Sequence, residues 1–189
     1  MIVFDPITHT YILNGQPVPS VTTILKDMNF IDTTWFTDYG RDRGKLVHKI
    51  IHWHITGELD ESTIDPELQG YFDAWKAFED ASGFVSTETE KPLASELYRF
   101  AGTPDIIGKF KDYGEVFDIK TGPVAPWTGL QLAAYEILAG RPLKRYALQL
   151  NKNGKYSLKP FAKRQDRQIF LAALACWWWQ KNNNMRGRG

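Results

Sequence analysis

The sequence contains a single cysteine, Cys176, among its 189 residues. One thiol excludes an intramolecular disulfide and any zinc or iron–sulfur site built from cysteines alone. Cys176 lies in the run Ala-Cys-Trp-Trp-Trp, and these apolar neighbours predict a small buried side chain rather than a reactive thiol.

The sequence also lacks long apolar runs. None approaches the roughly 18 residues of a membrane span. Residues 1–6 have neither the basic start nor the apolar stretch of a signal peptide. We therefore expect a protein without a membrane partner that resides in the cytoplasm.

Neither sign of charge is in excess. Lys and Arg total 23 and Asp and Glu total 22, which gives a formal net charge of +1. Domains that coat nucleic acid through bulk charge usually have a pI above about 9. This class is excluded, and any contact with DNA requires a local basic patch.

The composition is that of a folded domain. Hydrophobic residues make up 43% and charged residues 24% of the chain, which excludes a disordered protein. The length predicts one domain spanning residues 1–189. Within it we expect an N-terminal β-hairpin in residues 1–19, a core over about 35–160 and a C-terminal helix at 164–182.

Hydrophobic periodicity predicts the order of the elements. The pair Asn14-Gly15 favours a tight hairpin turn between strands at 10–13 and 16–18. Residues 41–55 form an expected helix whose buried face includes Leu46 and Val47. The remaining expected elements are helices at 21–27, 66–83 and 127–138, and strands at 84–91, 96–100 together with 102–110, 115–120, 145–150 and 155–160. This order predicts an α/β sandwich with a central mixed β-sheet flanked by helices.

Two carboxylates and a lysine are expected to meet on this sheet. Asp105 and Asp118 lie thirteen positions apart on consecutive strands, and antiparallel pairing brings such residues together. Lys120 stands two residues after Asp118, so both side chains leave the same face of one strand. The neighbouring residues are strongly apolar, and buried charges are costly unless they are paired or bind a metal.

The chemistry of this cluster has two interpretations. Two acidic oxygens and a main-chain carbonyl form a hard-oxygen site of the kind that Mg²⁺ or Mn²⁺ accepts. A lysine beside it can orient a water or stabilise charge on a phosphoryl group. The alternative is a structural bridge between Asp118 and Lys120, because an Asp-x-Lys tripeptide alone is a weak signal.

The neighbouring residues carry a resemblance to a known family. Pro104-Asp105, twelve intervening residues and Asp118-Ile119-Lys120 match the spelling of the PD-(D/E)XK motif. Gln131 and Tyr135, four residues apart on the expected next helix, match a further motif of the family. Gly40–His48 matches a helical segment that precedes the motif in the family. From about residue 10 to 150 the sequence resembles the PD-(D/E)XK nuclease superfamily, within it the RecB-like and phage lambda-type exonucleases.

The resemblance implies a fold and a set of site residues. The fold is a restriction-endonuclease-like sandwich, and Asp105, Asp118 and the Ile119 carbonyl would hold the metal. Lys120 would be the catalytic lysine that acts on the attacking water, and Gln131 would position the lysine or the water. His48 would complete the set of metal ligands. Relatives often carry an acidic ligand after this histidine on the same helix, and Glu90 would substitute for it here. Tyr135 would contact a substrate phosphate.

The resemblance also implies an activity. It is a Mg²⁺- or Mn²⁺-dependent DNA exonuclease at duplex ends, in phage or prophage recombination or repair, within bacterial or phage-infected cytoplasm. A ring-shaped homo-oligomer and a single-strand annealing protein are the partners that the family analogy adds. The alternatives are a structure-specific endonuclease or junction resolvase, and a catalytically silent DNA-binding or assembly protein.

Two further clusters of residues remain open to more than one interpretation. Arg41, Arg43 and Lys45 alternate near the start of a helix, where the dipole also favours anions. They form either a phosphate clamp in DNA binding or a solvated basic face. His48 and His52, four residues apart, have the spacing of a zinc-binding helix, but Lys49 stands where the general base of that motif would be.

Overall fold

The computed structural model describes residues 1–32, 37–110 and 113–185. Its helices and strands alternate along the chain much as the periodicity predicts. In chain order they are β1 (Ile2–Asp5), β2 (Thr10–Leu13), β3 (Gln16–Val18), α1 (Val21–Asp27), α2 (Asp38–Thr56), the 3₁₀ turn η1 (Glu61–Thr63), α3 (Pro66–Ser82), β4 (Val85–Thr89), β5 (Leu93–Ser95), β6 (Phe100–Gly102), β7 (Ile106–Phe110), β8 (Tyr113–Lys120), α4 (Thr128–Ala139), β9 (Lys144–Leu150), β10 (Tyr156–Pro160) and α5 (Gln165–Asn182).

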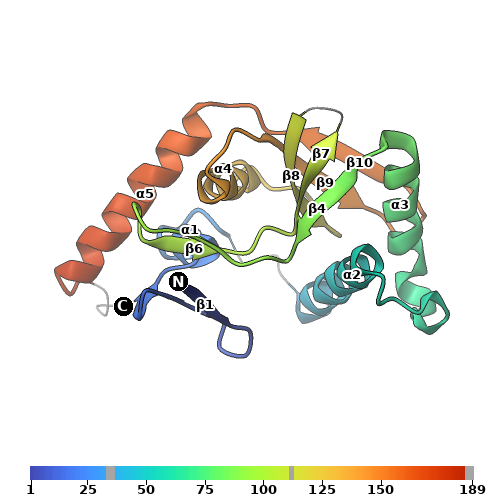
Figure 1. The fold of residues 1–189 in the computed structure, drawn as a ribbon, viewed down its shortest axis with the longest axis horizontal. Coiled ribbons are helices and arrows are strands. Elements are labelled where there is room, and N and C mark those ends of the chain that lie inside the picture. Colours follow the sequence, from blue (N-terminus) through green and yellow to red (C-terminus); the bar gives the residue numbers. More distant parts are fainter. Residues whose placement is uncertain (33–36, 111–112, 186–189) are drawn as a thin grey trace.

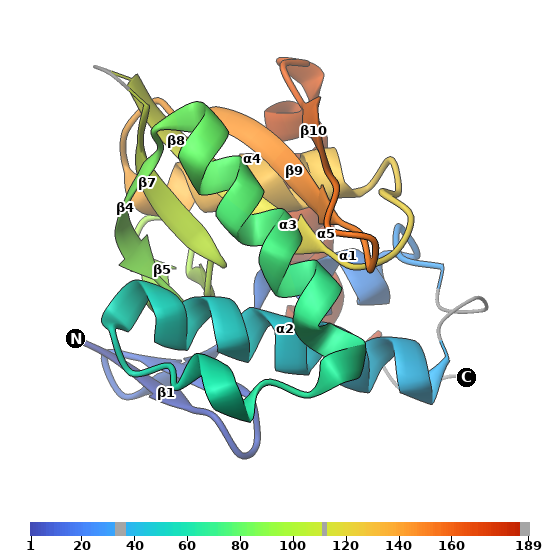
Figure 2. The ribbon, with the colours of Figure 1, turned by 90° about the vertical axis from the view of Figure 1, so that its right-hand side faces the viewer.

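A five-stranded mixed sheet forms the centre of the fold. Its strand order is β10-β9-β8-β7-β4, and β8 and β9 pair in parallel while the other pairs are antiparallel. Helices α2 and α3 cover one face of the sheet, and α4 and α5 lie on the other side (Figure 1). Turned by 90°, α3 crosses in front of the sheet with α2 beneath it (Figure 2). The predicted α/β sandwich is confirmed.

Alternation along β8 separates the two larger of three hydrophobic cores among the described residues. Val116 packs into the core that contains α1, α4 and α5. Phe117 and Ile119 pack into the opposite core, with α2 and α3. Since successive side chains of a strand point to opposite faces, Asp118 and Lys120 share the face of Val116 and look toward α4.

The strand expected at residues 96–110 is wrong as one element. It is divided into β6, which pairs with β5 in a separate two-stranded sheet, and β7, which joins the central sheet. Pro104 stands between them, and a proline cannot donate a hydrogen bond to a strand ladder. The division leaves Asp105 at the start of β7.

The N-terminal hairpin is confirmed and extended. Strands β2 and β3 pair across Asn14 and Gly15, whose φ angles of 50° and 78° suit the tight turn. Strand β1 adds a third member to this small sheet.

Two burial predictions are wrong. Leu46 is 50% exposed, because the buried stripe of α2 is the narrower set Val47, Ile50 and Ile51. Cys176 is exposed, because α5 turns Ala173 and Trp177 toward the core instead. Within the described segments, no helix is long and apolar enough to cross a membrane.

Helix α3 approaches the turn between β9 and β10 very closely at Gly70. A Cβ atom at this position would lie 1.9 Å from the carbonyl oxygen of Lys152. We expect Gly70→Ala to lower the free energy of unfolding by about 1–3 kcal/mol through overpacking. This loss opposes the roughly 1 kcal/mol that alanine normally gains over glycine within a helix.

Chemical denaturation tests this expectation, with the exposed α3 position Asp80→Ala as the control. The control should change stability by less than about 0.5 kcal/mol. A Gly70→Ala protein more stable than the parent would contradict the close approach.

Candidate active site

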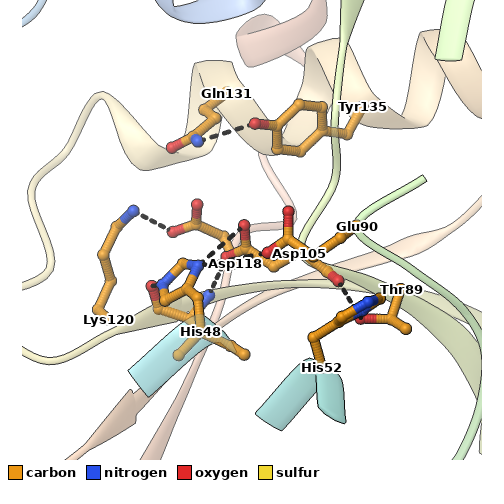
Figure 3. Close-up of polar contacts among 10 residues, drawn as sticks. His48, His52, Thr89, Glu90, Asp105, Asp118, Lys120, Gln131 and Tyr135 are labelled. Atoms are coloured by element: carbon orange, nitrogen blue, oxygen red, sulfur yellow. Dashed lines mark hydrogen bonds and ion pairs between the residues drawn. The ribbon is translucent and has the colours of Figure 1, made fainter. Parts of the chain in front are cut away.

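The structure brings Asp105, Asp118 and Lys120 together at one end of β7 and β8 (Figure 3). The register pairs Ile106 with Phe117, which places the two aspartates on adjoining strands. Asp118 is 1% exposed and Asp105 8% exposed. Asp118 Oδ2 lies 2.5 Å from Lys120 Nζ, and Asp105 Oδ2 accepts a hydrogen bond of 2.6 Å from the Ile119 backbone N–H.

Helix α2 adds His48 to this cluster. Its Nε2 lies 3.0 Å from the carbonyl oxygen of Ile119. Its Nδ1 lies 3.5 Å from Asp105 Oδ1 and 3.7 Å from Glu90 Oε1. One imidazole therefore touches the strand β8 carbonyl and two carboxylates from two other segments.

Glu90 reaches the cluster through unusual backbone. A register shift between Ser86 and Glu88 interrupts the pairing of β4 with β7. Glu90 then adopts φ of 49°, a left-handed conformation that is uncommon outside glycine. Its N–H donates to the Asp105 carbonyl at 3.0 Å, and the Thr89 hydroxyl donates to the same oxygen at 3.1 Å. These bonds stabilise a conformation of the kind that concentrates at functional sites.

A group of three side chains could hold a metal ion. Within residues 1–32, 37–110 and 113–185, ligand atoms of His48, Glu90 and Asp105 lie within 4.8 Å of one another. Two carboxylates and an imidazole suit Mn²⁺, and the carboxylates with the Ile119 carbonyl suit Mg²⁺. Asp118 is not in this group, and its carboxylate is paired with Lys120.

Burial and crowding shift the pKa values of the cluster in opposite directions. Burial raises the pKa of Asp118 to about 6, against the opposing effect of Lys120. Burial also raises the pKa of Glu90. For Asp105, burial is outweighed by His48, Lys120 and the Ile119 N–H, which together lower its pKa.

His48 is the cationic counterpart of these acids. Burial alone would lower its pKa, but Asp105 and Glu90 raise it well above the usual value. The two carboxylates therefore favour the protonated form of the imidazole, as they would favour any cation placed between them.

Helix α4 places Gln131 and Tyr135 over the carboxylates (Figure 3). Gln131 Nε2 donates to the Tyr135 hydroxyl at 3.1 Å, and both residues are buried. Burial and the charges of Asp105 and Asp118 raise the pKa of Tyr135 well above its usual value. The Gln131 Oε1 atom has no hydrogen-bond donor among the described residues, so an acceptor is available beside the cluster.

The three basic residues of α2 lie in different surroundings. Arg43 Nη2 donates to the Thr121 carbonyl at 3.1 Å, and the guanidinium stacks on Tyr39 and Tyr71. Arg41 pairs with Asp38, and Lys45 Nζ lies 3.7 Å from Asp42. All three basic residues nevertheless line one hollow of about 420 Å³, together with His48, Lys120 and Trp127.

A second hollow, of about 690 Å³, opens on the other side of His48. Glu90, Leu46 and Pro6 are among the residues that line it. His52 also lines it and lies 3.4 Å from the Thr89 hydroxyl. His52 is outside the described metal-ligand group, so the helical pair of histidines does not form the cluster.

Tyr11 is a residue of the site region that the sequence pattern does not reveal. It belongs to β2, and its hydroxyl lies 2.8 Å from that of Thr103. Burial raises its pKa, and the nearby charge of Glu90 adds to the shift. The only sequence signal is indirect, since Thr103 lies within the Gly-Thr-Pro-Asp segment that the family motif covers.

Comparisons with known proteins give a relationship in fold. No family model and no curated protein matches the sequence. A presumed exonuclease from Eubacterium rectale is 11% identical with a TM-score of 0.56, over 88% of this chain and 82% of that chain. An alkaline exonuclease from Laribacter hongkongensis is 15% identical with a TM-score of 0.43, over 88% and 93% of the two chains. The first similarity shows that this mixed α/β fold is shared with the Eubacterium rectale protein.

The raised pKa of Asp118 predicts a stabilising substitution. Its folded pKa of about 6 exceeds the ordinary value of 3.8, so its contribution to stability is lost as the pH rises through 6. In EDTA at pH 8, Asp118→Asn should therefore increase the free energy of unfolding by roughly 1–3 kcal/mol. Denaturation at pH 8 and pH 4 measures the difference, which should shrink at pH 4. Equal effects at both pH values would contradict a buried carboxylate with a raised pKa.

The raised pKa of His48 predicts that cation binding releases protons. The proton on the imidazole must leave before the ring can ligate a metal. The apparent affinity for Mn²⁺ should therefore rise with pH until the folded pKa of His48 is passed. Calorimetry in buffers of different ionisation enthalpy counts the protons, and His48→Gln should release about one fewer. The same proton count in both proteins would contradict this role of His48.

Proposed function

We propose that the protein is a metal-dependent deoxyribonuclease of the PD-(D/E)XK type, acting as an exonuclease on duplex DNA ends. The observation that carries the proposal is the convergence of Asp105, Asp118 and Lys120 with His48 at one end of the central sheet. This set includes carboxylates for a cation and an ammonium beside them, next to a hollow with basic residues. Each component is needed for phosphodiester hydrolysis, and a structural bridge alone would not require the other carboxylates.

His48, Glu90, Asp105 and the Ile119 carbonyl would hold the metal, with Asp118 as a ligand once Lys120 moves aside. The donor chemistry fits Mg²⁺ or Mn²⁺. Such a cation, when bound, supplies Lewis-acid stabilisation of the negative charge on the phosphoryl group. The elevated pKa values of Asp118 and Glu90 are consistent with this, because burial raises both and the negative charge of Asp105 adds to each shift.

Lys120 and Gln131 would act on the attacking water. Lys120 Nζ lies beside Asp118 and 5.3 Å from the centre of the Trp127 ring, at the wall of the basic hollow. Its ammonium can orient the water and stabilise developing charge. The free Oε1 of Gln131 can accept a hydrogen bond from the same water. Tyr135, whose high pKa keeps it protonated, can donate to a phosphate oxygen.

The basic residues would bind the substrate. Arg41 and Lys45 are exposed at the first turns of α2, and Thr37 caps this helix end through a bond to Gly40. Their positive charges and the helix dipole favour a phosphate in the hollow of about 420 Å³. Arg43 is held by Thr121 and would support the wall of this hollow.

The choice of an exonuclease rests on family resemblance and on the fold shared with the presumed exonuclease from Eubacterium rectale. The same resemblance suggests DNA recombination or repair in phage or prophage, a homo-oligomer and an annealing-protein partner. An endonuclease or junction resolvase would use the same central residues, so the substrate decides between them.

Linear and circular duplex DNA separate these activities. We expect Mg²⁺-dependent digestion of linear DNA, intact circles and no cleavage in EDTA. Lys120→Ala should lower the rate by about 10²–10⁴-fold, the usual contribution of a positioned acid–base group. The exposed residue Lys152 provides the control, since Lys152→Ala removes the same charge from a residue that does not line the hollow of about 420 Å³.

Cleavage of circles would assign an endonuclease. Full activity of Lys120→Ala, or cleavage that persists in EDTA, would remove the proposed mechanism. A protein that binds DNA without cutting any substrate would be the silent DNA-binding alternative.

A further inference from the structure

A further hollow of the described surface lies away from the candidate active site. It has a volume of about 740 Å³ and lies between the start of β9, the segment 160–164 and the first turns of α5. It shares no lining residue with the two hollows beside His48. We name it the β9–α5 pocket, lined among others by Leu143, Arg145, Phe161, Arg164, Arg167 and Leu171.

The floor of the β9–α5 pocket is apolar. Leu143 belongs to the core under α4 and α5, and Phe161 and Leu171 pack against that core while remaining partly exposed. Tyr146 packs against the opposite core and completes the lining. The hollow can therefore receive an apolar side chain without disturbing either core.

A recessed guanidinium stands in this apolar surface. The side chain of Arg145 is 7% exposed, and its Nη2 donates to the Lys163 carbonyl at 2.8 Å. Its Nε lies 3.5 Å from Glu136, and its Nη1 lies 3.7 Å from Asp166 Oδ2. Nη1 is buried and has no hydrogen-bond acceptor within reach among the described residues. Asp166 Oδ2, its ion-pair partner, is likewise buried without a hydrogen bond, so Arg145 is balanced by Glu136 and Asp166 within the fold.

The rim of the pocket adds positive charge. Lys144, Arg164 and Arg167 are exposed around it, whereas its lining contains one acid, Glu136, already beside Arg145. Arg164 is also the N-cap of the 18-residue helix α5, so the N-terminal end of this helix lies at the rim, where the Asp166 N–H donates to the Lys163 carbonyl at 3.3 Å. Asp166 lies in that first turn but faces Arg145.

We propose that the β9–α5 pocket binds an acidic peptide segment of a partner protein. A carboxylate of the segment pairs with the exposed rim cations Lys144, Arg164 and Arg167, and an adjoining apolar side chain enters the floor. Complementary charge favours this occupant, since the rim carries three exposed cationic side chains, Lys144, Arg164 and Arg167. A DNA backbone would use the rim but leave the apolar floor without contacts. The proposal does not depend on the nuclease function.

Fluorescence anisotropy tests the pocket with a labelled peptide, Asp-Asp-Leu-Phe-Asp. We expect saturable binding to the full chain and at least tenfold weaker binding of the neutral peptide Asn-Asn-Leu-Phe-Asn. The double variant Arg164→Glu/Arg167→Glu, which changes exposed residues, should weaken the acidic peptide at least tenfold. The matched variant Lys152→Glu/Lys155→Glu makes the same charge change on the β9–β10 turn and should leave binding unchanged.

A second pair of measurements separates the pocket from general electrostatics. Leu171→Asp places a negative charge in the apolar floor and should abolish peptide binding, with circular dichroism reporting whether the fold is retained. Arg145→Lys keeps a charge but removes the planar fork, and it should weaken binding less than Leu171→Asp. Absence of saturable binding, or an equal loss in the Lys152/Lys155 control, would overturn the proposal. Single-stranded DNA serves as a competitor of the peptide in the same assay. If it displaces the peptide, and if this displacement requires Arg164 and Arg167, the pocket binds nucleic acid and the proposal is overturned.

Discussion

The antiparallel contact between β7 and β8 is the constraint on which the rest of the site depends. It brings a carboxylate at the start of one strand beside a carboxylate near the end of the other, both almost fully removed from water. Burying two like charges side by side is unfavourable, and different neighbouring groups stabilise each carboxylate. Lys120 pairs with Asp118 from the same strand, while the backbone N–H of Ile119 and the imidazole of His48 satisfy Asp105.

The helices are placed so that each face of the sheet contributes to this centre. Alternation along β8 sends Phe117 and Ile119 toward α2 and α3, which anchors the helix that carries His48. The same alternation turns Asp118 and Lys120 toward α4, whose residues Gln131 and Tyr135 close the site from that side. The parallel pairing of β8 with β9 requires a crossover connection, and α4 is that crossover. The helix that connects the two parallel strands is thus also the helix that places Gln131 and Tyr135 over the carboxylates.

Features that depend on local periodicity could be predicted from the sequence, and features that depend on distant contacts could not. The Asn14-Gly15 turn, the helix containing His48 and the thirteen-residue spacing of Asp105 and Asp118 are all encoded by neighbouring residues. Leu46 and Cys176 are predicted to be buried, but their exposure depends on which face of each helix packs against the core. The left-handed backbone conformation of Glu90 could not be predicted either, because it depends on a hydrogen bond to the distant carbonyl of Asp105.

The position of β4 sets Glu90 apart from the other two carboxylates of the cluster. Strand β4 lies at the edge of the central sheet and pairs with β7 alone, across an irregular register. Edge segments open at lower free energy than strands with two neighbours, so β4 can detach while β7, β8 and β9 stay paired. Glu90 is therefore attached to the least supported strand of the sheet, whereas Asp105 and Asp118 belong to the segments of β7 and β8, each of which pairs with two neighbours.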